Sequence, residues 1–199
     1  MIRALAGMLS LVVLAGCTGG KSSGTGEKFE SVRDLQPDAA IAQNASLKIG
    51  QVDVPVAVVQ STETDRMILA LEAHGQVFER EVYRVAGDSF DLVEGAGEVY
   101  EDPLPILKFP LAIGDAWSWK GKMSSGNEPH DASAKIATSS EPLLLPAEGS
   151  TPSVLVVVDL EISGAGPTPA TRKLRFWFVK GKGLVKRQFG IASTREPAK

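Results

Sequence analysis

The stretch VLVVVDLEI, residues 154–162, decides the fold. Apolar side chains occupy every second position from Val154 to Ile162, whereas the intervening positions change from Leu155 and Val157 to two acids. A period of two is the repeat of a β-strand, because successive side chains of a strand point to opposite faces. The stretch therefore predicts a strand with one face in a hydrophobic core and the other partly in water.

The chain on the C-terminal side of this stretch repeats the pattern. Three apolar residues, Leu174, Phe176 and Phe178, alternate with residues that are mostly cationic, and Gly181-Lys182-Gly183 follows. Glycines at this spacing are typical of a hairpin turn, where the backbone needs positive φ angles. Residues 184–189 are then expected to form the last strand.

The chain on the N-terminal side also reads as short strands separated by Gly and Asp turns at intervals of about 8–12 residues, which is hairpin spacing. The expected strands lie at residues 54–59, 67–73, 77–85, 90–94, 98–101, around 117–120 and around 134–138. The sequence thus predicts a mainly β protein with little helix. We expect a curved antiparallel meander of about nine or ten strands, either an open sheet or a partly closed barrel.

Two segments interrupt the alternation. Residues 29–47 form the one stretch with a helical pattern, but Pro37 divides it, so we expect a short helix or turn there. Residues 103–110 carry three prolines among apolar residues. Proline removes a hydrogen-bond donor from a strand, so this segment is interpreted as a crossing that covers one end of the sheet.

The N-terminus carries a different signal. Residues 4–14 form an apolar run after Arg3 that is shorter than the roughly 20 residues needed to cross a bilayer. The sequence Leu14-Ala15-Gly16-Cys17 follows, and Cys17 is the single cysteine of the chain. The segment resembles the lipobox of bacterial lipoproteins, in which the thiol is diacylated and becomes the mature N-terminus. The resemblance implies lipidation at Cys17.

This interpretation divides the chain into three parts. Residues 1–16 are the expected lipoprotein signal peptide, residues 17–28 the acylated cysteine and a Gly/Ser-rich tether, and residues 29–199 a single extracytoplasmic β domain. The expected location is the bacterial cell envelope. Thr18, where an Asp would favour retention in the inner membrane, points to the outer membrane, facing the periplasm.

Charge is unevenly distributed. The whole chain has a net charge of −3, which does not favour nucleic acid as a partner. From Arg172 to Lys199, however, nine basic residues accompany a single acid, Glu196. Either these strands present a basic face to anionic lipid or cell-wall polymer, or they neutralise acidic strands across the sheet. The second interpretation is favoured.

Two stretches resemble an uncharacterised family of bacterial lipoproteins. The first, residues 109–117, reads Phe-Pro-Leu-x-x-Gly-x-x-Trp; the second, residues 176–186, is an aromatic run followed by Gly-x-Gly-Leu-Val-Lys. The family pattern carries Tyr and Ala-Pro where this chain has Phe178 and Val179-Lys180. The resemblance implies a β fold and an envelope location, and it implies no reaction.

Residue types that carry catalysis or metal binding are sparse. The two histidines, His74 and His130, fall at expected turns, and no nucleophile elbow or cysteine pair is present in the sequence. Carboxylate pairs such as Glu79 with Glu81 are expected on the solvent face of a meander, as is the pair Asp88 with Asp91. We therefore expect no enzyme activity, no metal and no cofactor.

Aromatic and cationic residues supply the candidate surface for a ligand or partner, which comprises Trp117, Trp119, Arg175 and Trp177. The favoured hypothesis is a membrane-anchored, non-enzymatic scaffold or interaction domain with an envelope protein or a lipid as partner. The alternative is a carrier of lipid or another hydrophobic ligand, of the half-barrel type used in lipoprotein transport. A cell-wall hydrolase is the third and least favoured hypothesis.

Overall fold

Strands account for nearly all of the described chain. The computed structural model describes residues 28–35, 43–49, 52–145, 149–164, 169–190 and 193–194, with the backbone alone for 43–49, 53 and 193–194. The strands are β1 (Lys28–Phe29), β2 (Gln43–Ile49), β3 (Val52–Glu63), β4 (Arg66–Ala73), β5 (Gln76–Val85), β6 (Ser89–Gly95), β7 (Glu98–Lys108), β8 (Leu111–Ala112), β9 (Ala116–Ser125), β10 (Glu128–Leu145), β11 (Gly149–Ile162), β12 (Ala170–Val179), β13 (Gly183–Phe189) and β14 (Ser193–Thr194).

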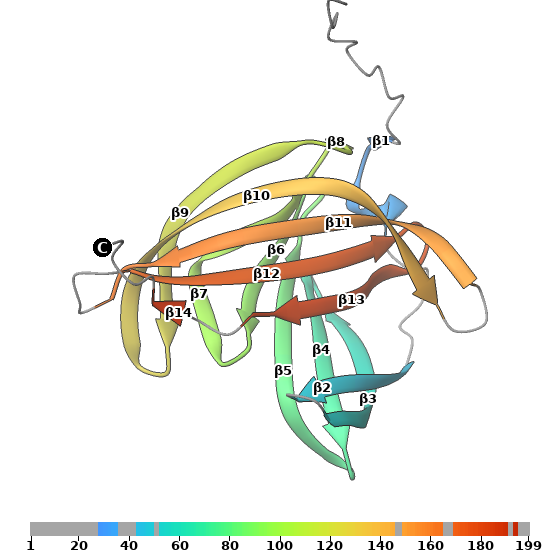
Figure 1. Cartoon of the computed structure of the whole chain (residues 1–199), viewed down its shortest axis with the longest axis horizontal. Helices are drawn as coiled ribbons and strands as arrows, with labels where there is room; N and C mark the ends of the chain where they lie inside the picture. Colours follow the sequence, from blue (N-terminus) through green and yellow to red (C-terminus); the bar gives the residue numbers. More distant parts are fainter. Residues whose placement is uncertain are drawn as a thin grey trace, which may run out of the picture.

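A single antiparallel sheet of twelve strands forms the body of the protein. Its order is β13-β12-β11-β10-β9-β7-β6-β5-β4-β3-β2, and β14 adds to β12 beyond the end of β13. From β2 to β13, each strand thus lies next to its neighbour in sequence, except that β8 leaves the sheet to pair with β1. The sheet curls strongly into an open half-barrel (Figure 1). The predicted curved antiparallel meander is confirmed.

The hydrophobic core lies inside the curl. Residues far apart in the strand order meet there: Phe90 of β6 packs edge-on against Phe178 of β12, with 5.5 Å between ring centroids. Strand β11 behaves as its alternation predicts, since the side chains from Val154 to Ile162 at even positions are buried while Asp159 and Glu161 are exposed. The two-residue period therefore determines which face of each strand enters the core.

The proline-rich segment corrects one expectation. Residues 98–108 form one continuous strand, β7, rather than a crossing over the end of the sheet. Strand β7 pairs with β9 only from Glu98 to Tyr100, so the later prolines face an edge where no ladder donor is required. The carbonyl of Pro105 instead accepts a hydrogen bond from the indole Nε1–H of Trp117 at 3.0 Å.

The expected helical stretch gives little helix. In its described residues, 29–35 and 43–47, the helical structure is one 3₁₀ turn, η1 (Val32–Asp34). The Asp34 carboxylate accepts hydrogen bonds from the backbone N–H groups of Glu30 and Ser31. Residues 43–47, the end of the same stretch, belong to strand β2. Pairing with β3 over its whole length thus overrides the weak helical pattern.

Candidate functional site

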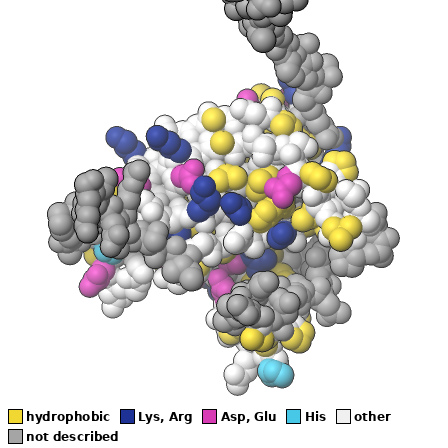
Figure 2. All heavy atoms as spheres, in the orientation of Figure 1, with side chains coloured by type: hydrophobic (Ala, Val, Ile, Leu, Met, Phe, Trp, Pro, Cys, Tyr) yellow, Lys and Arg dark blue, Asp and Glu magenta, His cyan; other side chains and the backbone are white. Residues whose placement is uncertain are grey.

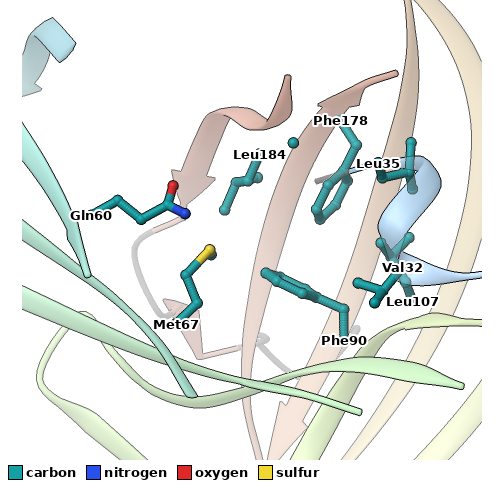
Figure 3. Close-up of a pocket in the computed structure, with 9 residues that line it drawn as sticks. Val32, Leu35, Gln60, Met67, Phe90, Leu107, Phe178 and Leu184 are labelled. Atoms are coloured by element: carbon teal, nitrogen blue, oxygen red, sulfur yellow. The ribbon is translucent and has the colours of Figure 1, made fainter. Parts of the chain in front are cut away.

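The interior of the half-barrel holds a hydrophobic core made of side chains from most of the strands. Figure 3 shows the pocket at its centre, where side chains from η1, β3, β4, β6, β7 and β12 converge with Leu184 of β13. Its volume is about 10 Å³, roughly the space of one water molecule. The lining residues are Val32, Leu35, Gln60, Met67, Phe90, Leu107, Phe178, Gly183 and Leu184.

A buried ionic cluster joins β5 to β13 across this interior. The Arg187 Nε donates to the Glu81 Oε1 at 2.5 Å, and the Tyr83 hydroxyl donates to the Glu81 Oε2 at 2.8 Å. Glu81 and Tyr83 alternate along β5, so both side chains point inward. Both carboxylate oxygens of Glu81 therefore accept hydrogen bonds from within the chain.

A second cluster of the same composition joins β7 to β12. The Arg172 guanidinium lies 2.5 Å from the Glu98 Oε1, and the Tyr100 hydroxyl donates to the Glu98 Oε2 at 3.1 Å. The tripeptide Glu-Val-Tyr occurs at both places, at residues 81–83 and 98–100. In each case the cation comes from the basic C-terminal segment, whose Lys173 also pairs with Asp159. These pairs agree with the favoured interpretation of that segment, neutralisation across the sheet.

Burial shifts the protonation equilibria in both clusters. Removal from water raises the pKa of Glu81 above its ordinary value, although the Arg187 charge and the hydrogen bonds from Arg187 and Tyr83 act in the opposite direction. Burial and the neighbouring carboxylates raise the pKa of Tyr83 and the pKa of Tyr100. The hydroxyls therefore stay protonated as donors to the two glutamates. Chemically, this arrangement binds strands together and presents no activated nucleophile.

The two tyrosines of the chain are both in these clusters, so tyrosinate absorbance reports on them alone. In the unfolded chain they ionise near pH ~10. Because folding raises both pKa values, their contribution to stability is complete below pH ~10 and is lost as the pH rises further, by about 1.4 kcal/mol per unit for each tyrosine. We expect tyrosinate to appear only together with unfolding, followed by circular dichroism. Reversible ionisation near pH ~10 in the folded protein would contradict the clusters.

A second pocket lies near the pairing of β1 with β8. Its volume is about 210 Å³, and its described lining is mostly apolar with two hydroxyls and one cation. The residues that line it are Phe29, Ile113, Ser140, Pro152, Ser153, Val154, Phe178 and Lys180. Phe178 lines both this pocket and the central one.

The structure divides the predicted surface residues between two faces. Trp117 is partly buried and Trp119 is buried beside Tyr100, both on the inner side of β9. Arg175 and Trp177 lie on the outer side of β12, where Trp177 is 3% exposed and the Lys186 Nζ stands 4.5 Å from its ring centroid. Among the residues that the structure describes, the indole N–H of Trp177 finds no hydrogen-bond acceptor. The four residues therefore do not form one surface, and Cys17 lies outside the described residues.

Sequence reasoning misplaced two of the acids. Glu81 and Asp91 were expected in water, but both are buried, Glu81 with Arg187 and Asp91 with Arg84 of the neighbouring strand. The repeated Glu-Val-Tyr tripeptide was the available signal for the clusters. The tripeptide alone does not predict a cluster, because the arginines that pair with its two glutamates lie far away in the sequence.

In the described part of the chain, no group of three or more His, Cys, Asp or Glu side chains is arranged to hold a metal ion. Among the same residues, no helix has the length and hydropathy needed to span a membrane. Comparison of the sequence and structure with protein families, curated proteins and solved structures finds no match.

Proposed function

We propose that this protein is a lipid-anchored component of the bacterial envelope whose β domain acts as a non-enzymatic scaffold for a partner. The observation that carries the proposal is the hydrophobic core inside the curl, where the central pocket has a volume of only about 10 Å³. A carrier that encloses a whole lipid needs a far larger cavity, since even drug-sized ligands occupy roughly 300–1,000 Å³. The lipobox-like sequence at Cys17 supports the anchor.

The partner surface in this proposal is the outer face of β11–β13. Leu155 lies opposite Trp177, which lies opposite Lys186, and in the next row Val157 lies opposite Arg175. Figure 2 shows hydrophobic and basic side chains next to one another over these strands. Trp177 is itself buried, so the area that a partner can touch comes from the half-buried Leu155, Val157 and Arg175. Apolar area combined with Arg is a composition that protein interfaces favour. An acidic, partly apolar protein surface is the complementary partner.

A second candidate function, binding of a hydrophobic ligand, is favoured by the pocket of about 210 Å³ near β1. That volume suits part of a lipid rather than a whole one. Enzymatic hydrolysis receives less support, because the oxygens of the buried glutamates already accept hydrogen bonds from Tyr and Arg side chains.

One experiment tests both parts of the proposal. The full chain carries a photo-crosslinking side chain at position 157, and the cells are fractionated after irradiation. We expect the protein in the membrane fraction with a crosslinked envelope protein. Cys17→Ser should move it to the soluble fraction, because the acyl chains supply the anchor. Arg175→Glu should remove the crosslink without releasing the protein.

The matched control places the crosslinker at Val59, which is exposed on β3, away from this face. Retention of the Cys17→Ser protein in membranes would refute the anchor. Equal crosslinking from positions 157 and 59, or a crosslink that survives Arg175→Glu, would refute the partner surface.

A further inference from the structure

The pocket near β1 lies on the inner face of the sheet. Ser140 of β10, Val154 of β11 and Phe178 of β12 are cross-strand partners, so their side chains form one row on that face. Phe29 of β1 and Ile113, the residue after β8, complete the apolar lining from outside this row. The pocket is thus bounded by the long sheet and by the β1–β8 pair.

The lining changes from apolar and buried to polar and exposed. Phe29 and Phe178 are 2% exposed and Val154 is 3% exposed, so these three side chains form the deep part of the pocket. Ser140 and Lys180 are exposed and mark its mouth. A molecule that enters this pocket therefore places its apolar end first and keeps its polar end at the mouth.

The polar groups of the lining favour an uncharged ligand. The Ser153 hydroxyl donates to the Glu141 carbonyl at 2.5 Å, so this buried side chain has the acceptor that its hydrogen needs. Lys180, the one charged side chain in the described lining, already has an interaction partner within the chain. A carboxylate or phosphate that entered here would give up water without a free cation to pair with.

The volume sets the length of alkyl chain that fits. An apolar cavity of roughly 150 Å³ binds benzene. This pocket has a volume of about 210 Å³, so by the same ratio it holds about eight carbons of an alkyl chain. Lipids in a bilayer keep the ends of their chains at the middle of a hydrocarbon core that is roughly 30 Å thick. A pocket that takes the chain end first therefore suits a free single-chain molecule.

We propose that this pocket binds a neutral single-chain amphiphile tail first. The last carbons of the alkyl chain, about eight of them, lie against Phe29, Val154 and Phe178, and the uncharged polar group of the ligand lies beside Ser140. The inference rests on the second candidate function, binding of a hydrophobic ligand, and names the class and the orientation of that ligand. It depends neither on the lipid anchor nor on the partner surface of β11–β13.

The test titrates 1-alkanols into the full chain with Cys17→Ser, so that no acyl chain of the protein competes. Nuclear magnetic resonance follows the methyl groups of Ile113 and Val154, which line the pocket. Each methylene that enters the pocket leaves water, so the dissociation constant should fall about fourfold per carbon from hexanol to octanol. It should change by less than about twofold from nonanol to decanol, because the pocket is then full. The methyl groups of Val59, exposed on β3, should not shift.

Two adjacent serines provide matched variants. Ser140→Trp places an indole at the mouth of the pocket and should abolish octanol binding. Ser139→Trp places the same side chain at the neighbouring exposed position, which points to the other face of β10, and should leave octanol binding unchanged. Ile113→Trp fills the pocket from the side of β8 and replaces Ser140→Trp if that variant does not fold.

Octanoate distinguishes a neutral ligand from an anion and should bind less tightly than octanol. Octanoate binding that is tighter than octanol binding would overturn the neutral class of the ligand. The pocket itself would be refuted by the absence of methyl shifts with octanol, by an affinity that does not depend on chain length, or by binding that survives a filled pocket. The fractionation and crosslinking experiment uses no alkanol, so it tests the anchor and the partner surface separately.

Discussion

Replacing Arg187 with methionine is expected to lower the free energy of unfolding by about 3–5 kcal/mol. Glu81 is 2% exposed at its side chain and Arg187 is 15% exposed, so the pair is desolvated. Without the guanidinium, Glu81 either remains charged with no cation beside it or takes up a proton at a cost in free energy. The variant removes the ion pair and the hydrogen bond that Arg187 gives to Glu81, and it leaves the hydrogen bond from Tyr83. The expected loss is therefore that of a broken buried ion pair.

Urea denaturation measures this loss in the free energy of unfolding, and two further variants serve as controls. The triple variant Glu81→Met, Tyr83→Phe and Arg187→Met removes both charges together with the buried hydroxyl that donates to Glu81. It should recover most of the lost stability, since apolar replacement of a whole buried ionic cluster is often neutral. Lys173→Met breaks the pair with Asp159, whose side chains are 52% and 60% exposed, and should cost at most about 1 kcal/mol. A loss for Arg187→Met no larger than that of Lys173→Met would contradict the buried cluster.

Phe178→Ala is expected to cost a further large amount, about 3–5 kcal/mol in the free energy of unfolding. Phe178 is 2% exposed, packs edge-on against Phe90 and lines both the central pocket and the pocket near β1. Its removal deletes this ring contact between β6 and β12 and leaves a cavity in the core. Both the lost transfer free energy and the cavity reduce stability.

A residue of the same type supplies the control for this prediction. Phe78 of β5 is 46% exposed, so Phe78→Ala should change stability by less than about 1 kcal/mol. Both variants are compared by their denaturation midpoints at constant slope, so that the difference reports on the native state. Similar losses at Phe78 and Phe178 would show that the inner face of β12 is not the core.

Much of this fold follows from local sequence. The alternation at residues 154–162 and the alternating apolar residues Leu174, Phe176 and Phe178 each specify a strand and its buried face, because the period is a property of the strand itself. The turns rich in Gly mark where strands end. The proline-rich segment could not be interpreted in this way. Whether Pro105 is tolerated depends on which edge of β7 is paired, and that is a property of the whole sheet.

The site was less predictable for the same reason. Glu81 looks like a solvent-exposed acid until Arg187, 106 residues away, is placed opposite it by the curl of the sheet. Trp177 lies between Phe176 and Phe178 and is therefore expected on the outer, solvent-facing side of β12. It is nevertheless buried and lies under Lys186. The local sequence indicates which face of a strand enters the core. It does not indicate which strand lies across the barrel.

The residues of each ionic cluster are far apart in the sequence, so the ribosome adds them to the chain at different times. A chain is synthesised from its N-terminus at about 5–20 residues per second, so Arg187 is added on the order of 5–20 s after Glu81. During that interval the strands from β3 to β7 can pair with their neighbours, but their inward-facing acids have no cation and retain water. The strands that carry Arg172 and Arg187 are among the last to be made. The curl of the half-barrel is therefore the last feature of the fold to become stable, and a nascent chain stays open until its C-terminal strands arrive.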